Sequence, residues 1–296
     1  MAERFMAAAG RLDAVVAGYL GMPRADVQRA IAEGRIRVDG SPRPKSHRLR
    51  GGELVELDAA GLDEVPAESP PANVRYEDGF LLVVSKPAGI PTHPTRQRRT
   101  GTLVNRLKAT GVPLSGVGGP LRAGIVHRLD AGTSGLLIVA KDDRTHEALS
   151  DMLRAHAIDR RYLALVRGAV PHDRFAVEAP LGRRGARIVV ARTAGRPAET
   201  MFEVRERFGR STLLEAAPRT GRTHQIRVHL SAIRHPILGD RTYGGGGTDA
   251  GELGLARPFL HSWRVAFDHP RTRERVEVED PLPEDLVAAL DHARTG

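Results

Sequence analysis

Helical and strand patterns follow one another within the first sixty residues. Apolar side chains recur at helical spacing over 11–20, and a second helix is predicted from Pro23 to Glu33. Residues 35–38 then alternate basic and apolar positions and lead into Asp39-Gly40, a strong hairpin signal, and a last strand is predicted over 53–57. The pattern indicates a small unit of two helices and a β-hairpin.

The pattern changes after residue 58. Residues 59–72 hold three prolines and three acids with few apolar positions, so they cannot bury much and are predicted to be a linker. Beyond them, short alternating apolar runs predict many strands, among them 81–84, 136–140, 162–166 and 188–190. Clear helical patterns are fewer and lie at 101–109, 143–155, 223–233 and 284–293.

Strands with scattered helices and no regular βαβ rhythm predict an α+β fold. We expect a small α/β-hairpin domain over 1–58 and a linker over 59–72. Over 73–296 we expect a larger domain with a mixed, mainly antiparallel sheet and flanking helices. A length of 296 residues is consistent with about two domains.

Composition narrows the partners and the chemistry. The formal charge of +9 and the pI of about 10.6 favour a polyanionic partner, which could be RNA, DNA, acidic lipid or acidic protein. Because the chain has no cysteine, disulfides, thiolate zinc sites and cysteine nucleophiles are excluded. No apolar run approaches the ~18 residues of a membrane span, and the first ten residues do not resemble a secretory signal. We expect a cytoplasmic monomer.

The string from His127 to Gly135 is the most specific motif. It is a charged loop that ends in small, turn-forming residues and leads into the apolar run 136–140. Asp130 would therefore lie on a rigid edge, where the backbone can approach a ligand. An Asx-turn, in which Asp130 only ties down the backbone of the next two residues, explains the same pattern, and the residues alone favour it.

A second string runs from Thr220 to Leu230. Gly221 indicates a turn, and the side chains that follow can donate to phosphates or bases: Arg222, Gln225, Arg227 and His229. His224 and His229 could suggest a metal site, but a spacing of five residues places them on different faces of a helix or a strand. No metal site is predicted. The segment 183–196 carries five arginines and no acid. This composition fits equally well a hairpin that binds the phosphates of a nucleic acid and a hairpin that is only exposed to solvent.

Together these strings resemble the RluA family of pseudouridine synthases. The resemblance rests on H-R-L-D-x-x-T-S-G at 127–135 and on four further blocks in family order, at 76–95, 160–168, 220–230 and 236–244. It implies an isomerase that converts selected uridines of an RNA to pseudouridine without cofactor or metal. It also implies that the target base is flipped out of the RNA stack.

The resemblance also implies a role for each site residue. Asp130 would attack the flipped uridine, with a glycal intermediate and a covalent base adduct both open. Tyr162 would lie against the uracil and take part in removing the proton from carbon five. Arg222 would pair with Asp130, since an adjacent cation favours the ionised form of a carboxylate nucleophile. Arg128 would fill the gap in the RNA stack, and His127 and Arg227 would contact the RNA.

The first 58 residues resemble the S-four RNA-binding domain. The matching segments are R-L-D at 11–13, P-R at 23–24, Q-R-A-I at 28–31, G-R-I-R-V-D-G at 34–40 and G-G-E-L-V at 51–55. Pro23 replaces the usual serine and Asp39 a common asparagine. Eight basic residues between Arg24 and Arg50, against three acids, predict an RNA-binding face that includes Arg24, Arg35 and Arg37. A merely solvated basic face is the alternative.

The sequence thus predicts an RNA pseudouridine synthase that acts on 23S ribosomal RNA of the large subunit. A tRNA target is one alternative. A non-catalytic ribosome-assembly factor is another, but it would predict the loss of Asp130, Tyr162 or Arg222, and all three are present. A metal-dependent RNA hydrolase is disfavoured by the histidine spacing.

Overall fold

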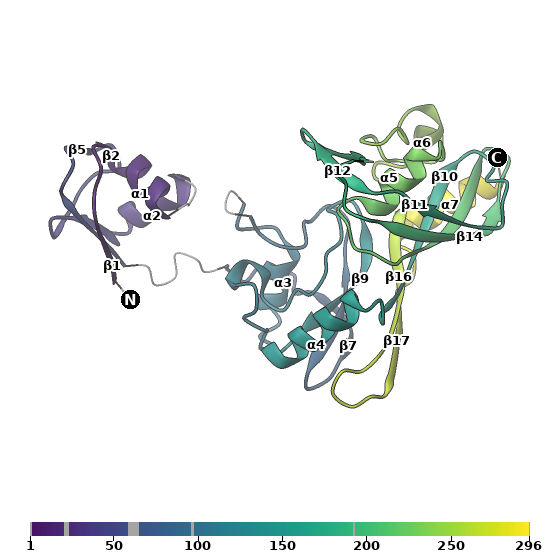
Figure 1. Ribbon diagram of the computed structural model, residues 1–296, viewed down its shortest axis with the longest axis horizontal. Helices are drawn as coiled ribbons and strands as arrows, with labels where there is room; N and C mark the ends of the chain where they lie inside the picture. Colours follow the sequence, from purple (N-terminus) through teal and green to yellow (C-terminus); the bar gives the residue numbers. More distant parts are fainter. Residues whose placement is uncertain (1, 21–23, 59–64, 96–97, 192, 296) are drawn as a thin grey trace.

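The computed structural model describes residues 2–20, 24–58, 65–95, 98–191 and 193–295 (Figure 1). Its N-terminal unit contains two helices, α1 (Leu12–Leu20) and α2 (Arg24–Ala32). The proline predicted to start the second helix lies outside the described residues. The unit also has a four-stranded sheet in the order β1 (Ala2–Met6), β6 (Leu54–Asp58), β3 (Ile36–Val38) and β4 (Ser41–Pro42), and a short pair of β2 (Gly10–Arg11) with β5 (Arg48–Leu49).

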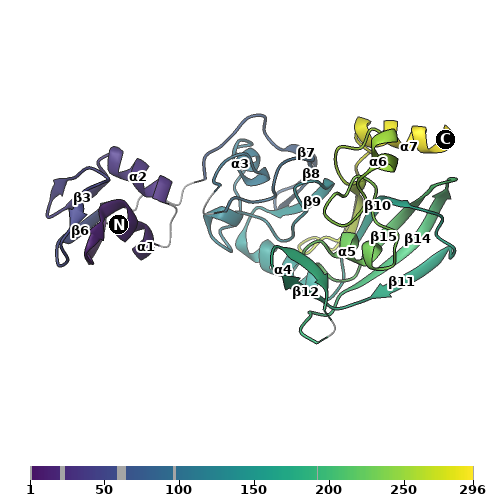
Figure 2. The same cartoon turned by 90° about the horizontal axis from the view of Figure 1, so that it is seen from above.

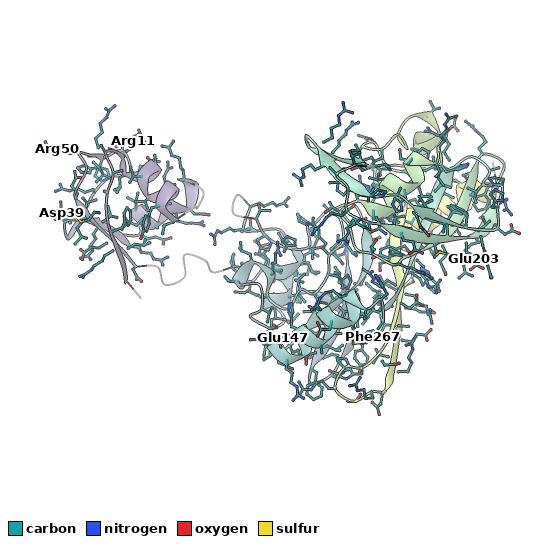
Figure 3. The ribbon with its side chains drawn as sticks, viewed as in Figure 1. Arg11, Asp39, Arg50, Glu147, Glu203 and Phe267 are labelled. Carbon is teal, nitrogen blue, oxygen red and sulfur yellow. The ribbon has the colours of Figure 1, made fainter. Side chains whose placement is uncertain are left out.

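The predicted hairpin joins β3 to β4. Asp39 and Gly40 both have positive φ, 48° and 73°, as the tight two-residue turn between twisted strands requires (Figure 3). The buried side chains of this unit, which include Leu12, Val27 and Ile36, form a core of their own. The predicted α/β-hairpin fold of the N-terminal unit is therefore confirmed, with β1 as an additional strand.

Of the predicted linker, residues 59–64 lie outside the described residues, and residues 65–72 contact the larger unit. Val65 is only 1% exposed and belongs to the core of the larger unit. Pro66 O accepts a hydrogen bond from the buried Asn105 side chain at 2.9 Å, and Glu68 accepts one from the Gly101 N–H at 2.7 Å. Residues 65–72 thus pack on the larger unit beside α3 (Leu103–Lys108), where the N–H groups of Glu68 and Ala72 also donate to the carbonyl oxygens of Asn105 and Arg106.

A nine-stranded sheet forms the larger unit, and it is antiparallel except for one parallel pair, β16 with β9. Figure 2 shows β7, β8 and β9 together on the left of the larger unit and β10, β15, β14 and β11 on its right. The strand order is β11 (Arg174–Glu178), β14 (Glu199–Arg207), β15 (Ser211–Pro218), β10 (Asp159–Arg167), β16 (Leu260–Asp268), β9 (Ser134–Ala140), β8 (Leu81–Lys86) and β7 (Asn73–Glu77), and β17 (Arg275–Glu279) also pairs with β16.

Helices and a separate hairpin flank this sheet. They are α3, α4 (Asp143–Arg154), α5 (Gln225–Ala232), α6 (Thr248–Glu252), α7 (Glu284–Thr295), a 3₁₀ turn (Pro120–Arg122) and the hairpin of β12 (Leu181–Arg184) with β13 (Arg187–Val190). The predicted α+β class and mainly antiparallel sheet are confirmed, as are the four predicted helices within two residues or so at each end.

The central strand β9 is buried along its whole length, because both faces of the sheet are covered there. Leu137 and Val139 pack into the core that contains α3, whereas Leu136 and Ile138 pack into the core that contains Leu149 of α4. This two-sided burial explains why the run 136–140 is apolar at every position. The strand therefore gives the loop before it a rigid end.

Gly135 is required where the two halves of the sheet meet. It lies in the parallel pairing of β9 with β16, opposite Ser262, and has a φ of +111°. A Cβ atom at this position would lie 2.2 Å from Ser262 O, so no other residue fits without moving a strand. The last glycine of the 127–135 motif is therefore a packing requirement.

We predict that residues 65–296 fold without the N-terminal unit, since the two units have separate cores and touch where Arg99 donates to Asp26 at 2.9 Å. Residues 73–296 should be less stable, because Val65 is lost and the Asn105 amide loses an acceptor. These losses should lower the melting temperature by at least about 5 °C. Thermal unfolding followed by circular dichroism measures both fragments; equal melting temperatures, or an insoluble 65–296 fragment, would contradict this account.

Candidate functional site

One cleft of about 680 Å³ gathers the residues that the two motifs supply. Its lining comes from the loop before β9, from β10 and from the segment that leads into α5. The predicted residues that line it are His127, Arg128, Asp130, Tyr162, Arg222 and Arg227. Segments about a hundred residues apart in the sequence therefore meet at one site.

The loop that carries Asp130 is fixed by hydrogen bonds on both sides of that residue. Leu129 exchanges two bonds with the Thr92 hydroxyl, at 2.8 and 3.1 Å. Ala131 O accepts from the Gly89 N–H at 2.8 Å and from Lys86 Nζ at 3.3 Å. The carboxylate of Asp130 is thus presented on an immobile backbone, and its side chain is 17% exposed.

Asp130 is paired with Arg227. Arg227 Nη1 donates to Asp130 Oδ2 at 2.9 Å. The same guanidinium makes two parallel bonds to Asp240, from Nε at 2.7 Å and from Nη2 at 3.0 Å. In the described residues no backbone group accepts or donates at the Asp130 carboxylate, so the Asx-turn alternative does not describe this aspartate.

The prediction that Arg222 pairs with Asp130 is wrong. Arg222 Nε donates to Pro197 O at 3.1 Å, and its side chain lines the cleft. Arg227, expected to contact RNA, occupies the place beside Asp130. The physical reason is the start of α5 at Gln225: Arg222 precedes the helix, whereas Arg227 lies within it, on the face turned to the carboxylates.

Arg227 and Asp240 form a buried ionic pair beneath the cleft, with 10% and 1% of their side chains exposed. Burial by itself lowers the pKa of Arg227, but the hydrogen bonds and charges of Asp240 and Asp130 outweigh it and raise the pKa above its ordinary value. Asp240 also accepts from the N–H groups of Thr242 and Tyr243, at 3.1 and 3.3 Å. The cation beside Asp130 is therefore permanent and fixed in direction.

His127 lines the cleft, but one of its ring nitrogens is engaged by the protein, and its contact with RNA stays a prediction. Its Nε2 accepts a hydrogen bond from the Ile138 N–H at 3.0 Å. Burial, reinforced by the charge of Arg160, lowers the pKa of His127 to about 3, so the ring is neutral. The ring thus supports the second half of β9. Its neighbour Arg128 is exposed at the rim of the cleft, a position from which it can reach a bound molecule.

Tyr162 lies in the wall of the cleft on β10, with 6% of its surface exposed. The pairing of β10 with β16 shifts register between Arg161 and Tyr162, and such a bulge re-aims the side chains next to it. Burial raises the pKa of the Tyr162 phenol, so the group is neutral at physiological pH. The ring is placed to lie against a flat ligand in the cleft, and its contact with uracil stays a prediction.

In the N-terminal unit, two of the three predicted RNA contacts also serve the fold. Arg24 donates to the fully buried Asp13 at 2.9 Å, together with Arg11, which is labelled in Figure 3. The hydrogen bond from Arg11 lowers the pKa of Asp13 well below its usual range, against the effect of burial. Arg35 donates to Asp58 O at 3.0 Å, and Arg37 is exposed. Their contact with RNA remains a prediction.

Three side chains to which the sequence analysis gave no catalytic role contact Asp130, its partner Arg227 or the loop that carries Asp130. Lys86 is fully buried and donates to three carbonyl oxygens, of Pro87, Ile90 and Ala131. Burial lowers the pKa of Lys86 to about 7, against the attraction of Asp130. His224 Nε2 lies 3.8 Å from Asp130 Oδ2, and Tyr243 contacts both His224 and Arg227. All three lie in the sequence blocks that resemble the family, and this position was the signal in the sequence that could have pointed to them.

The other histidine of the second string has a structural place. His229 is buried and bonds to the Thr200 hydroxyl at 3.0 Å and to Ala179 O at 3.1 Å.

Within the described ranges, no three side chains of His, Cys, Asp or Glu come together in an arrangement that could hold a metal ion. No helix there has both the length and the apolar character needed to span a membrane.

Comparisons with known proteins agree with this geometry. The sequence model of the RNA pseudouridylate synthase family matches residues 80–232. An uncharacterised RNA pseudouridine synthase of Bacillus subtilis, YlyB, is 41% identical over 276 residues, which cover 92% of this chain and 89% of the relative. The ribosomal large subunit pseudouridine synthase D of Nitrosomonas europaea is 38% identical over 295 residues, covering 96% of this chain and 84% of the relative.

A solved structure, human RNA pseudouridylate synthase domain containing 1, superposes with a TM-score of 0.58 and 27% identity over 74% of this chain and 86% of that one. Human RNA pseudouridylate synthase domain containing 4, at 24% identity and a TM-score of 0.59, shares the fold over 75% of this chain and 93% of that one. The match of the family model and the extended identity to the bacterial relatives show that this chain belongs to the RluA family of RNA pseudouridine synthases.

Proposed function

We propose that Asp130 is the catalytic carboxylate of this isomerase and that the target is a uridine of large-subunit ribosomal RNA. The observation that carries the first part is the ion pair of Asp130 with the buried Arg227 at the floor of the cleft. A nucleophilic carboxylate has to be ionised, and a permanent cation at 2.9 Å favours that form. The pair also fixes the orientation of the carboxylate before substrate arrives.

The remaining cleft residues have complementary roles. A uridine turned out of its helix brings a flat base against the Tyr162 ring and exposes its glycosidic bond to Asp130. The bond from the ribose to nitrogen one of uracil breaks, and a bond from the same ribose carbon to carbon five forms. Carbon five then loses its proton, and nitrogen one gains a proton. Arg128, exposed at the rim, takes the place of the extruded base.

The N-terminal unit supports the choice of a large RNA. It has a core separate from that of the catalytic unit and exposes Arg37 and Arg50, so a second contact with the same RNA can raise the effective concentration at the cleft. We propose that it is an S-four-type RNA-binding domain. Several relatives are named for the ribosomal large subunit, including those of Nitrosomonas europaea and Xanthomonas campestris, which supports a 23S target. We further propose that the protein acts in the cytoplasm as a monomer, because ribosomal RNA is its proposed substrate and one chain supplies Asp130, Tyr162 and Arg227.

Arg227→Met should reduce kcat by about a hundredfold or more, because Asp130 and Asp240 lose their shared cation. Arg222→Met is the matched control in the same segment, since Arg222 donates to a carbonyl and not to Asp130. Its kcat should stay at least about tenfold above that of Arg227→Met, with the larger change in RNA affinity. Single-turnover rates at saturating RNA measure this, at a temperature where thermal melts show both variants folded. Equal rates for the two variants would remove Arg227 from its assigned role.

Purified protein should form pseudouridine in unmodified large-subunit ribosomal RNA and not in bulk unmodified tRNA. Carbodiimide-based sequencing maps the product at single-nucleotide resolution. Modification of a tRNA loop with the ribosomal RNA untouched would overturn the proposed target.

Asp130→Asn is the negative control for that experiment, because asparagine keeps the shape of the side chain but cannot be an anionic nucleophile. Its affinity for RNA should be close to that of the wild type. If this variant retains about a tenth or more of the wild-type rate, Asp130 is not the catalytic carboxylate.

A further inference from the structure

Tyr243 connects three parts of the site. Its ring lies against the guanidinium of Arg227, with Cζ 5.0 Å from the ring centre. Its hydroxyl oxygen accepts a hydrogen bond from the Ile188 N–H at 3.2 Å and lies 2.8 Å from Nδ1 of His224. Ile188 belongs to β13, so one phenol joins the arginine-rich hairpin to the two side chains nearest Asp130.

Donor and acceptor rules favour one tautomer of His224, in which Nδ1 accepts the phenol proton of Tyr243. The backbone N–H of Ile188 can only donate, so the phenol of Tyr243 accepts there and has its own proton left to donate. Of the described groups within hydrogen-bond distance of that hydroxyl, only Nδ1 of His224 can accept this proton. A neutral imidazole that accepts at Nδ1 carries its proton on Nε2.

That Nε2–H faces the catalytic carboxylate. Nε2 lies 3.8 Å from Asp130 Oδ2, the same oxygen that accepts from Arg227. Burial lowers the pKa of His224, and Arg227 and Arg128 act in the same direction against Asp130 and Asp240, so the ring is neutral at physiological pH. Arg227 donates to Oδ2, the oxygen that His224 Nε2 also faces, and Oδ1 has no donor among the described residues.

The backbone of His224 supports a dedicated role for this side chain. It has φ 56° and ψ 20°, a left-handed conformation at the residue immediately before α5. A residue with a Cβ adopts this region rarely, and it persists where the surroundings hold it in place. The bond to Tyr243 is such a restraint, and the strained turn directs the imidazole at Asp130.

We propose that His224 is a positioning residue for Asp130, and that Tyr243, held by the β12–β13 hairpin, sets its tautomer so that the Nε2–H points at Oδ2 of the carboxylate. Arg227 and His224 together engage Oδ2, and Oδ1 is the oxygen that attacks the substrate. The inference rests on the proposed catalytic role of Asp130.

The 3.8 Å separation is too long for a hydrogen bond in the free enzyme. It closes when RNA binds, as catalytic hydrogen bonds commonly tighten in the substrate complex. The exposed arginines at 183, 184 and 187 place positive charge on the hairpin that carries Ile188. A phosphate backbone held there would steady Tyr243 and, through it, His224. This links occupancy of the hairpin to the orientation of the nucleophile.

The tautomer is tested directly in the free enzyme, without any substrate. Long-range proton–nitrogen NMR spectra of protein labelled at histidine distinguish Nδ1–H from Nε2–H, and the His224→Gln variant assigns the signal. We expect the Nε2–H form in the wild type and its loss or mixing in Tyr243→Phe, which keeps the ring beside Arg227. An Nδ1–H form in the wild type would overturn the proposal.

Single-turnover rates on RNA test the consequence. His224→Gln keeps an N–H near the position of Nε2 and should stay within about threefold of the wild type, whereas His224→Leu should be slower by about tenfold or more. Tyr243→Phe should slow the wild type but have little further effect in the His224→Gln background, because it acts through the imidazole. Equal rates for the Gln and Leu variants, or an equal effect of Tyr243→Phe in both backgrounds, would overturn the proposal. An active Asp130→Asn would instead overturn the proposed function, and the NMR result would stand.

Discussion

Arg227 is a cation buried between two carboxylates, and the geometry of the site depends on this arrangement. A buried charge is stable only when it is paired and its hydrogen bonds are satisfied. Asp240 accepts two parallel hydrogen bonds from the guanidinium, which leaves Nη1 of Arg227 directed at Asp130. The loop that carries Asp240 is tightly wound: a Cβ on Gly245 would lie 1.6 Å from Ile237 O. The position of the cation is thus set by backbone packing, away from the substrate.

Asp130 is fixed from the other side by equally local constraints. Lys86 and Thr92 hold the backbone on either side of Asp130, and β9 is buried on both faces immediately after it. Gly135 allows β9 to meet β16 in the parallel pair that joins the two halves of the sheet. The rigid parts meet at the cleft, so little reorganisation of the carboxylate is needed when RNA binds.

Local patterns could predict the elements and the motif loop, because both depend on near neighbours in the sequence. Asp39-Gly40 specifies its hairpin, and the apolar run 136–140 specifies a doubly buried strand. Contacts between distant segments could not be predicted in this way. Whether Arg222 or Arg227 meets Asp130 depends on where α5 begins and how it is oriented, which no spacing within the string records. The burial of Val65 among prolines and acids is a tertiary effect of the same kind.

We propose that Asp130 is kept reactive by Arg227, whose own position is set by Asp240. The most direct test is the single-turnover rate of Asp240→Asn on its RNA substrate, because the side chain of Asp240 is only 1% exposed and its carboxylate bonds Arg227, not Asp130. We expect the single-turnover rate of Asp240→Asn to be lower than that of the wild type by about tenfold to a hundredfold, and its RNA affinity to stay within about threefold of the wild type. A wild-type rate in this variant would contradict it.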